Sequence, residues 1–170
     1  MAGAPVPKDA AAPRRGGGAR RRARAAVVQA LYQWQMTGQD AAEIERQFLT
    51  DRIAEDAPAV DRGFFRELLH GVVAAAPRLD RRIEPLLDRP VAQVDPVECA
   101  ILRLGAFELV ERLEIPTGVT INEAVELAKT FGGENGHRYV NGVLDRLARD
   151  VRPGNDAADG SRRVGRRRER

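Results

Sequence analysis

Four arginines crowd the start of the first predicted helix, at Arg20, Arg21, Arg22 and Arg24. The beginning of a helix carries partial positive charge, so each cation there is unfavourable by roughly 0.3–1 kcal/mol. The cluster therefore opposes helix formation unless an anion binds it. Because the planar guanidinium can donate two parallel hydrogen bonds to a phosphate, the run predicts contact with nucleic acid.

The simpler alternative is a solvated run of charge. Arginine makes up 26 of the 28 basic residues, which indicates a coding bias that favours arginine over lysine. That bias explains the residue type but not the clustering at one helix end. We therefore favour a polyanionic partner.

A second candidate group surrounds a glycine-rich turn, where Phe131 and Tyr139 flank a segment that contains Asn135 and Arg138. Exposed aromatic rings beside cationic groups stack on the bases of single-stranded RNA. The same spacing also fits two core aromatics and an N-capping Asn135. The spacing alone favours that simpler interpretation.

Signatures of catalysis and metal binding are scarce. His70 and His137 fall on separate predicted helices, and the single cysteine, Cys99, lies in the most apolar one, which makes a poor zinc site. No strand precedes a glycine-rich phosphate loop, and the acid pair Glu123 and Glu126 is expected to be solvated. With no apolar run that suits a membrane span or signal peptide, we expect a cytoplasmic, non-enzymatic protein without metal or cofactor.

The residues from 20 to 153 show helical periodicity and no strand-like alternation. The apolar stripes and caps predict an all-α single domain of about seven helices: 20–36, one from 40, one from 58, one from 77, 95–110, 120–131 and one that spans 140–147. Asp95, Pro96 and Glu98 form the best start signal, and Thr120 with Glu123 resembles a second capping box. Since 97–110 is apolar on nearly every side, we expect that helix at the centre.

Charge divides the chain into a body and two basic ends. Residues 1–24 carry +6 and residues 151–170 carry +4, so the total of +3 leaves −7 for residues 25–150. The terminal segments 1–19 and 154–170 have no periodic apolar face and are predicted to be disordered. The solvated interpretation is favoured for the C-terminal tail, and the RNA interpretation for the arginines at the helix start.

Several runs resemble the NusB family. They are Arg20–Arg24 continued by Val28-Gln29-Ala30-Leu31-Tyr32 and Trp34-Gln35, Phe65-Arg66-Glu67-Leu68-Leu69-His70-Gly71-Val72, Ala100-Ile101-Leu102-Arg103, Ile121-Asn122-Glu123-Ala124-Val125-Glu126-Leu127-Ala128-Lys129 with Phe131-Gly132, and Tyr139-Val140-Asn141-Gly142-Val143-Leu144-Asp145. Together these runs cover about 20–153. The resemblance implies an all-helical fold of two packed subdomains.

The same resemblance implies a transcription antitermination factor. Such a factor binds the boxA element of nascent ribosomal RNA and pairs with NusE, a small-subunit ribosomal protein, in a complex on RNA polymerase. The implied RNA-binding residues are Arg20, Arg21, Arg22, Arg24, Gln29, Tyr32, Phe131, Asn135, Arg138 and Tyr139. The implied partner-binding residues are Glu98 and Arg103.

One departure and two alternatives accompany this resemblance. Many relatives carry an acid where this chain has Asn135, and the loss of a negative charge beside RNA is expected to favour binding. The same domain type also occurs fused to an RNA cytosine methyltransferase, but the sequence shows no further catalytic domain. A homodimeric RNA-binding scaffold, with its arginine-rich surface masked, is the other alternative.

Overall fold

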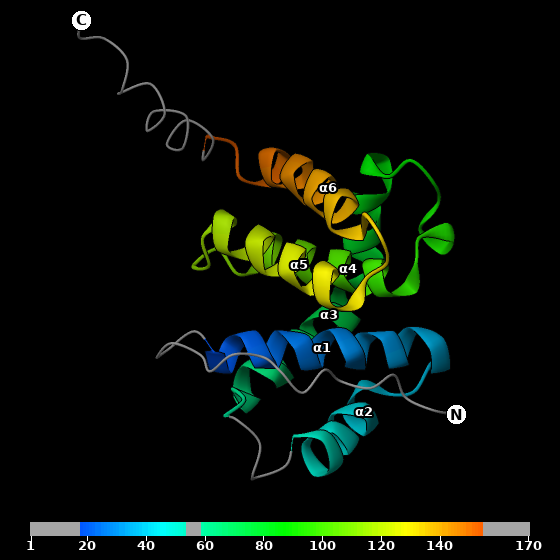
Figure 1. Cartoon of the computed structure of the whole chain (residues 1–170), viewed down its shortest axis with the longest axis vertical. Helices are drawn as coiled ribbons and strands as arrows, with labels where there is room; N and C mark the ends of the chain where they lie inside the picture. Colours follow the sequence, from blue (N-terminus) through cyan, green and yellow to red (C-terminus); the bar gives the residue numbers. More distant parts are fainter. Residues whose placement is uncertain (1–17, 54–58, 155–170) are drawn as a thin grey trace, which may run out of the picture.

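The computed structural model describes residues 18–53 and 59–154, and all regular secondary structure within them is helical (Figure 1). The six α-helices are α1 (Gly18–Thr37), α2 (Ala41–Gln47), α3 (Arg62–Ile83), α4 (Pro96–Glu111), α5 (Thr117–Phe131) and α6 (Gly136–Val151). A π-helical segment, η1 (Phe48–Arg52), extends α2, and two 3₁₀ turns, η2 (Glu84–Leu86) and η3 (Val91–Gln93), connect α3 to α4. The predicted all-α fold is confirmed.

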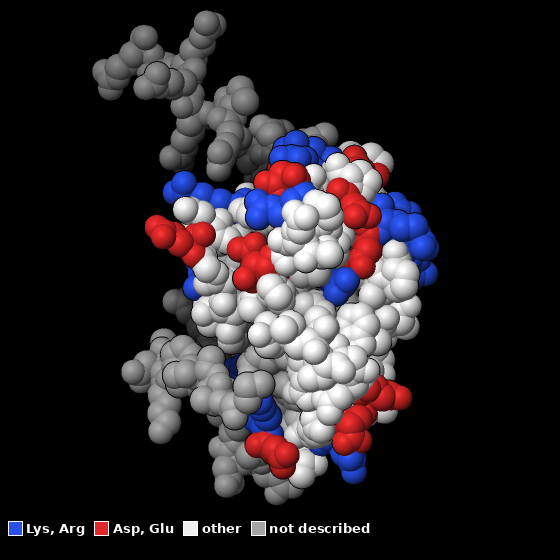
Figure 2. Space-filling view, turned by 90° about the vertical axis from the view of Figure 1, so that its right-hand side faces the viewer, with Lys and Arg blue, Asp and Glu red and all other residues white. Residues whose placement is uncertain are grey.

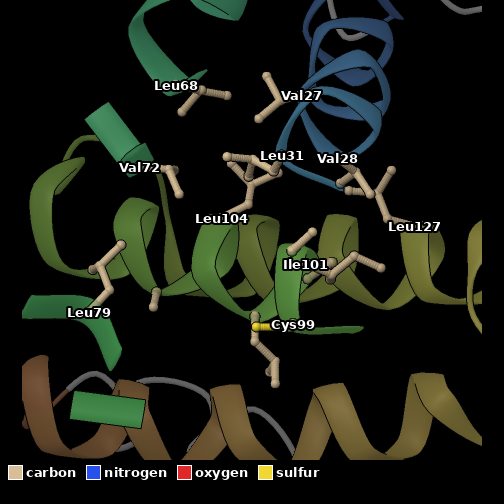
Figure 3. Packing of buried hydrophobic residues seen from close by; sticks show 14 of the residues in the cluster. Val27, Val28, Leu31, Leu68, Val72, Leu79, Cys99, Ile101, Leu104 and Leu127 are labelled. Carbon is tan, nitrogen blue, oxygen red and sulfur yellow. The ribbon is translucent and has the colours of Figure 1, made fainter. Parts of the chain in front are cut away.

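The helices form two packed groups that share one core. In Figure 1, α1 and α2 lie below and α4, α5 and α6 lie above, with α3 passing behind. The apolar helix α4 packs against α1, α3, α5 and α6, as its sequence predicts. Figure 3 shows Leu104 of α4 meeting Leu31 of α1 near Val72 of α3, and all three belong to one continuous buried cluster.

The starts of α2 and α4 lie where the sequence predicts them. The Asp95 carboxylate accepts hydrogen bonds from the backbone N–H of Val97 (3.0 Å) and Glu98 (3.2 Å), and Pro96 occupies the first helical position. Asp40 likewise caps α2 by accepting from the N–H of Ala42 (2.9 Å). An N-cap of this kind stabilises a helix by about 1 kcal/mol.

The third and fourth predicted helices are a single helix, and the prediction of a boundary at Pro77 is wrong. Pro77 lies inside α3 and deprives the Val73 carbonyl of its usual donor, at a cost of about 3 kcal/mol. Residues on both sides of it, such as Val72 and Leu79, lie on one buried face. Each buried side chain contributes about 1.5–3 kcal/mol, so burial outweighs the lost bond.

The starts of α3 and α5 also differ from the sequence prediction. Pro58 lies outside the described residues, and α3 begins at Arg62, where the Asp61 carboxylate accepts from the N–H of Phe64 (2.9 Å). In α5, the N–H of Thr120 donates to the Pro116 carbonyl (3.1 Å), so Thr120 already lies inside the helix. The predicted capping box at Thr120 is therefore wrong, and its buried hydroxyl has no hydrogen-bond partner.

The predicted terminal segments lie almost entirely outside the described residues, since α1 starts at Gly18 and the description ends at residue 154. None of the helices in the described ranges has the length and apolar character needed to cross a bilayer.

Candidate nucleic-acid interface

Helices α1 and α5 bring the two candidate groups onto one side of the molecule. Arg21 of α1 donates to Glu123 of α5, and both helices run in the same direction in Figure 1. Tyr32 lies eleven residues beyond Arg21, and Phe131 lies eight residues beyond Glu123, which correspond to about 16 and 12 Å of helix. We call the exposed faces of α1 and α5, with the turn at 131–139, the α1–α5 surface.

Three arginines are exposed or half-buried at the basic end of this surface, and each has a partner in the chain. The Arg20 guanidinium lies 4.4 Å from the ring centroid of Phe64 and 3.8 Å from the Asp61 carboxylate. Arg22 donates to the carbonyl of Ala59 (2.7 Å). These contacts hold the start of α1 against the segment that precedes α3.

Arg24 is buried, which corrects the expectation that all four arginines meet RNA. It is 4 % exposed and donates to the carboxylate of Glu108 from Nη2 (2.6 Å) and Nε (3.1 Å). Its guanidinium also lies 5.0 Å from the centroid of Phe64. Because Arg24 shares a helix face with the core residues Val27 and Val28, it points inward and closes an ion pair between α1 and α4.

Arg152 follows α6 directly and was not among the residues predicted from the sequence. Its guanidinium donates to four backbone carbonyls that end α4 and begin the next loop, those of Glu108, Leu109, Arg112 and Ile115, at 2.7–3.1 Å. The guanidinium N–H groups thus supply donors to carbonyls at a helix end, where backbone acceptors lack intrahelical partners. A basic residue directly after the last apolar stripe was the only sequence signal for this contact.

Beyond Arg24, the α1 part of the α1–α5 surface is uncharged. Residues 25–39 contain no charged side chain, and Tyr32 and Met36 are exposed there, one turn apart. The Gln29 side chain accepts a hydrogen bond from Arg52 (3.3 Å), and its amide nitrogen donates to the carbonyl of Ala25 within α1 (3.4 Å). Figure 2, viewed from the side where α1 ends, shows a broad uncharged area bordered by acidic and basic groups.

At the aromatic turn the simpler sequence interpretation is partly right. Phe131 and Tyr139 are half-buried and pack against the core cluster. Asn135 has left-handed backbone (φ 63°), which asparagine tolerates better than most residues, and it makes no side-chain cap bond. Arg138 is exposed and has no partner among the described residues.

Tyr139 is anchored by the segment after η2. Its hydroxyl donates to Asp88 (3.1 Å), and the Arg89 guanidinium lies 5.3 Å from its ring centroid. Burial and the Asp88 contact raise the pKa of Tyr139. The hydrogen bond from Arg89, aided by Tyr139, lowers the pKa of Asp88 to about 2.

The two predicted partner-binding residues lie on different faces of α4, since five residues correspond to about 140° around a helix. Glu98 is half-buried against Gly136, and a Cβ atom on Gly136 would collide with Oε1 of Glu98. Burial, and secondarily the charge of Asp95, raises the pKa of Glu98. Arg103 donates to Asp80 (2.8 and 2.9 Å) and to Gln35 (3.0 Å). Arg103 therefore makes its hydrogen bonds and ion pair within the chain. The Glu98 carboxylate has no ion-pair partner among the described residues.

No group of three or more His, Cys, Asp and Glu side chains in the described ranges is placed to hold a metal ion. Cys99 is buried on α4, and burial raises the pKa of its thiol, as the sequence predicts for a core cysteine.

Comparison with known proteins gives consistent results. The model of the NusB family matches residues 21–149. The transcription antitermination protein NusB of Nitrosococcus oceani is 55% identical over 133 residues, 78% of this chain and 87% of that protein, and that of Halorhodospira halophila is 54% identical over 132 residues, 78% of this chain and 83% of that protein.

Solved structures agree in fold. NusB of T. maritima matches with a TM-score of 0.70 and 33% identity over 82% of this chain and 96% of that one. A crystal structure of the antitermination factors NusB and NusE in complex with double-stranded RNA matches with a TM-score of 0.68 and 25% identity, over 76% of this chain and 96% of that one. This chain therefore belongs to the NusB family.

Proposed function

We propose that this chain is a transcription antitermination factor that binds boxA RNA of nascent ribosomal transcripts on its α1–α5 surface, together with NusE. Its relatives bear the name of an antitermination protein, and a structural neighbour was solved with NusE and RNA. A factor of this kind acts in the bacterial cytoplasm, on the transcript and RNA polymerase, and needs no catalytic group of its own.

The observation that carries the proposal is the joint placement of arginines and aromatic rings, each exposed or half-buried, on two neighbouring helices. Arg20, Arg21 and Arg22 supply guanidinium donors for phosphates, and phosphate contacts dominate sequence-independent affinity. About 12–16 Å farther along, Tyr32 and Phe131 offer ring faces for bases. Gln29, Asn135, Arg138 and Tyr139 complete the RNA-binding set, which no longer includes Arg24.

For the protein partner we propose a contact through Glu98 rather than Arg103. Glu98 has no ion-pair partner among the described residues, whereas Arg103 would have to leave Asp80. Glu98→Lys is expected to weaken the NusE complex and to leave RNA binding by the chain alone nearly unchanged. Equal damage to both activities would mean that Glu98 acts only in folding.

The test is a gel-shift titration of the full chain with a boxA-containing RNA and with a scrambled RNA of equal length, each with and without purified NusE. We expect weak binding by the chain alone and a clear preference for the boxA RNA when NusE is present. Equal affinity for both RNAs in both conditions would overturn the proposal. Light scattering on the same samples tests the homodimer alternative, in which RNA would dissociate a dimer.

A further inference from the structure

Glu123 lies within the surface that is proposed to bind RNA, although it is an acid. Its carboxylate is mostly buried, with 13% of the side chain exposed, while the side chain of Arg21 is 59% exposed. Arg21 donates to it from Nη2 (2.9 Å) and from Nε (3.2 Å to one oxygen, 3.3 Å to the other). One edge of the guanidinium is therefore occupied by a carboxylate.

This pairing determines what a phosphate meets at Arg21. An arginine has five N–H donors, so the edge formed by Nη1 and the outer hydrogen of Nη2 is still open. A phosphate on that edge lies near the Glu123 charge, which repels it. A phosphate that displaces Glu123 leaves a mostly buried carboxylate without its cation, which is costly. Both routes lower the affinity for RNA.

We propose that Glu123 is a specificity-determining residue of the RNA surface. By neutralising Arg21 in the free protein, it keeps charge-driven, sequence-independent RNA binding weak, so that retention of an RNA depends on base contacts farther along the surface. This inference rests on the proposed function. The hydrogen bond and charge of Glu123 also raise the pKa of Arg21, with a smaller contribution from Glu126, so the pair is electrostatically coupled.

The chain offers a matched control one turn along α5. Glu126 carries the same charge on the same helix but pairs with Lys129 (3.2 Å), and it forms no hydrogen bond with Arg21 among the described residues. Replacing Glu126 with Gln removes one negative charge near the surface without releasing Arg21. The difference between Glu123→Gln and Glu126→Gln therefore measures the pairing and not the net charge.

The experiment measures the affinity of the full chain for a boxA RNA and for an unrelated RNA of equal length at several salt concentrations. Glu123→Gln is expected to tighten binding of the unrelated RNA about 3- to 5-fold and to steepen the slope of log affinity against log salt by up to about 0.7. The boxA RNA is expected to gain less, so the ratio of the two affinities falls. Glu126→Gln is expected to change both RNAs equally and by less than about 2-fold.

The same substitution in a variant that lacks Arg21 completes the test. In Arg21→Ala, the further change Glu123→Gln is expected to give no more gain than Glu126→Gln, because the arginine that it would release is gone. The inference is overturned if Glu123→Gln behaves like Glu126→Gln, if its gain persists without Arg21, or if it weakens binding, which would make Glu123 a residue that orients Arg21 for phosphate. If the unmodified chain binds neither RNA, the proposed function itself fails. Circular dichroism melts confirm that each variant is folded.

Discussion

The two ends of the α1–α5 surface differ in how far their polar groups are already satisfied. At the basic end, Arg20, Arg21 and Arg22 each contact an acid or a carbonyl of the chain. At the turn, the side chains of Asn135 and Arg138 have no partner in the described part of the chain. An RNA that binds the basic end must exchange existing contacts, whereas at the turn it adds new ones. The positive charge of the basic end is therefore expected to contribute less to RNA affinity than its number of arginines implies.

The largest expected effect concerns Arg24, which belongs to the arginine run in the sequence but lies in the core of the structure. Arg24→Ala leaves Glu108 buried without its cation and is expected to cost about 3–5 kcal/mol of unfolding free energy. Urea denaturation measures the loss. The paired change Arg24→Met with Glu108→Leu replaces both charges by apolar groups and is expected to be far milder. A loss below about 1 kcal/mol in the single variant would place Arg24 at the surface.

At the turn, Phe131→Ala tests base stacking. A stacked base contributes about 1–3 kcal/mol and depends little on salt, so the affinity for boxA RNA should fall while the salt slope stays constant. Isothermal titration at several salt concentrations measures both, with a thermal melt to separate any loss of core packing. Leu113→Ala, which removes an exposed apolar side chain from the α4–α5 loop, is the control. A salt slope that changes with Phe131 would contradict the distinction between the two ends.

At the basic end, replacing Arg21 and Arg22 together with Ala should reduce the salt slope by about 0.7 and weaken all RNAs alike. The slope corresponds to one full phosphate contact, that of Arg22, because Glu123 already neutralises Arg21. The matched control replaces Arg81 and Arg82, two exposed arginines in the last turn of α3 that form no ion pair among the described residues. If the two double variants lose affinity and slope equally, the basic end is only a general positive charge.

The smallest expected effect concerns the anchor of Tyr139. The pKa of Asp88 is about 2, below its ordinary value near 3.8, so its contribution to stability is complete above that ordinary value and is lost as the pH falls towards 2. Carboxyl NMR should therefore show Asp88 still ionised at pH 3, with the Tyr139 ring environment unchanged. Arg89→Ala should raise the pKa of Asp88 towards its ordinary value. Titration of Asp88 near its ordinary value in the unmodified chain would mean that the anchor is not formed in solution.

Local signals in the sequence were sufficient to predict most helices and some of their caps. Asp40 and Asp95 accept bonds from N–H groups two or three residues away, and Gly38, with φ of 69°, follows α1 where a left-handed residue commonly ends a helix. The central position of α4 followed from its apolar surface on all sides. The arginine run and the aromatic turn were also found as candidate groups, since residue type and clustering alone reveal them.

The sequence pattern failed at two helix boundaries. Pro77 breaks a helix locally, yet the buried stripe on both sides keeps α3 continuous. Thr120 has the residue type of a cap, yet Pro116 starts α5 one turn earlier.

By itself, the sequence determined the helical class, the position of most helices and the two candidate groups for RNA binding, because these depend on neighbours within a few positions. Only the tertiary structure decided which acid each of these arginines pairs with. Arg24 finds Glu108 across 84 positions, and Arg21 finds Glu123 across 102. An ion pair depends on a partner from another helix and on its distance in space, which the local pattern of one helix does not encode.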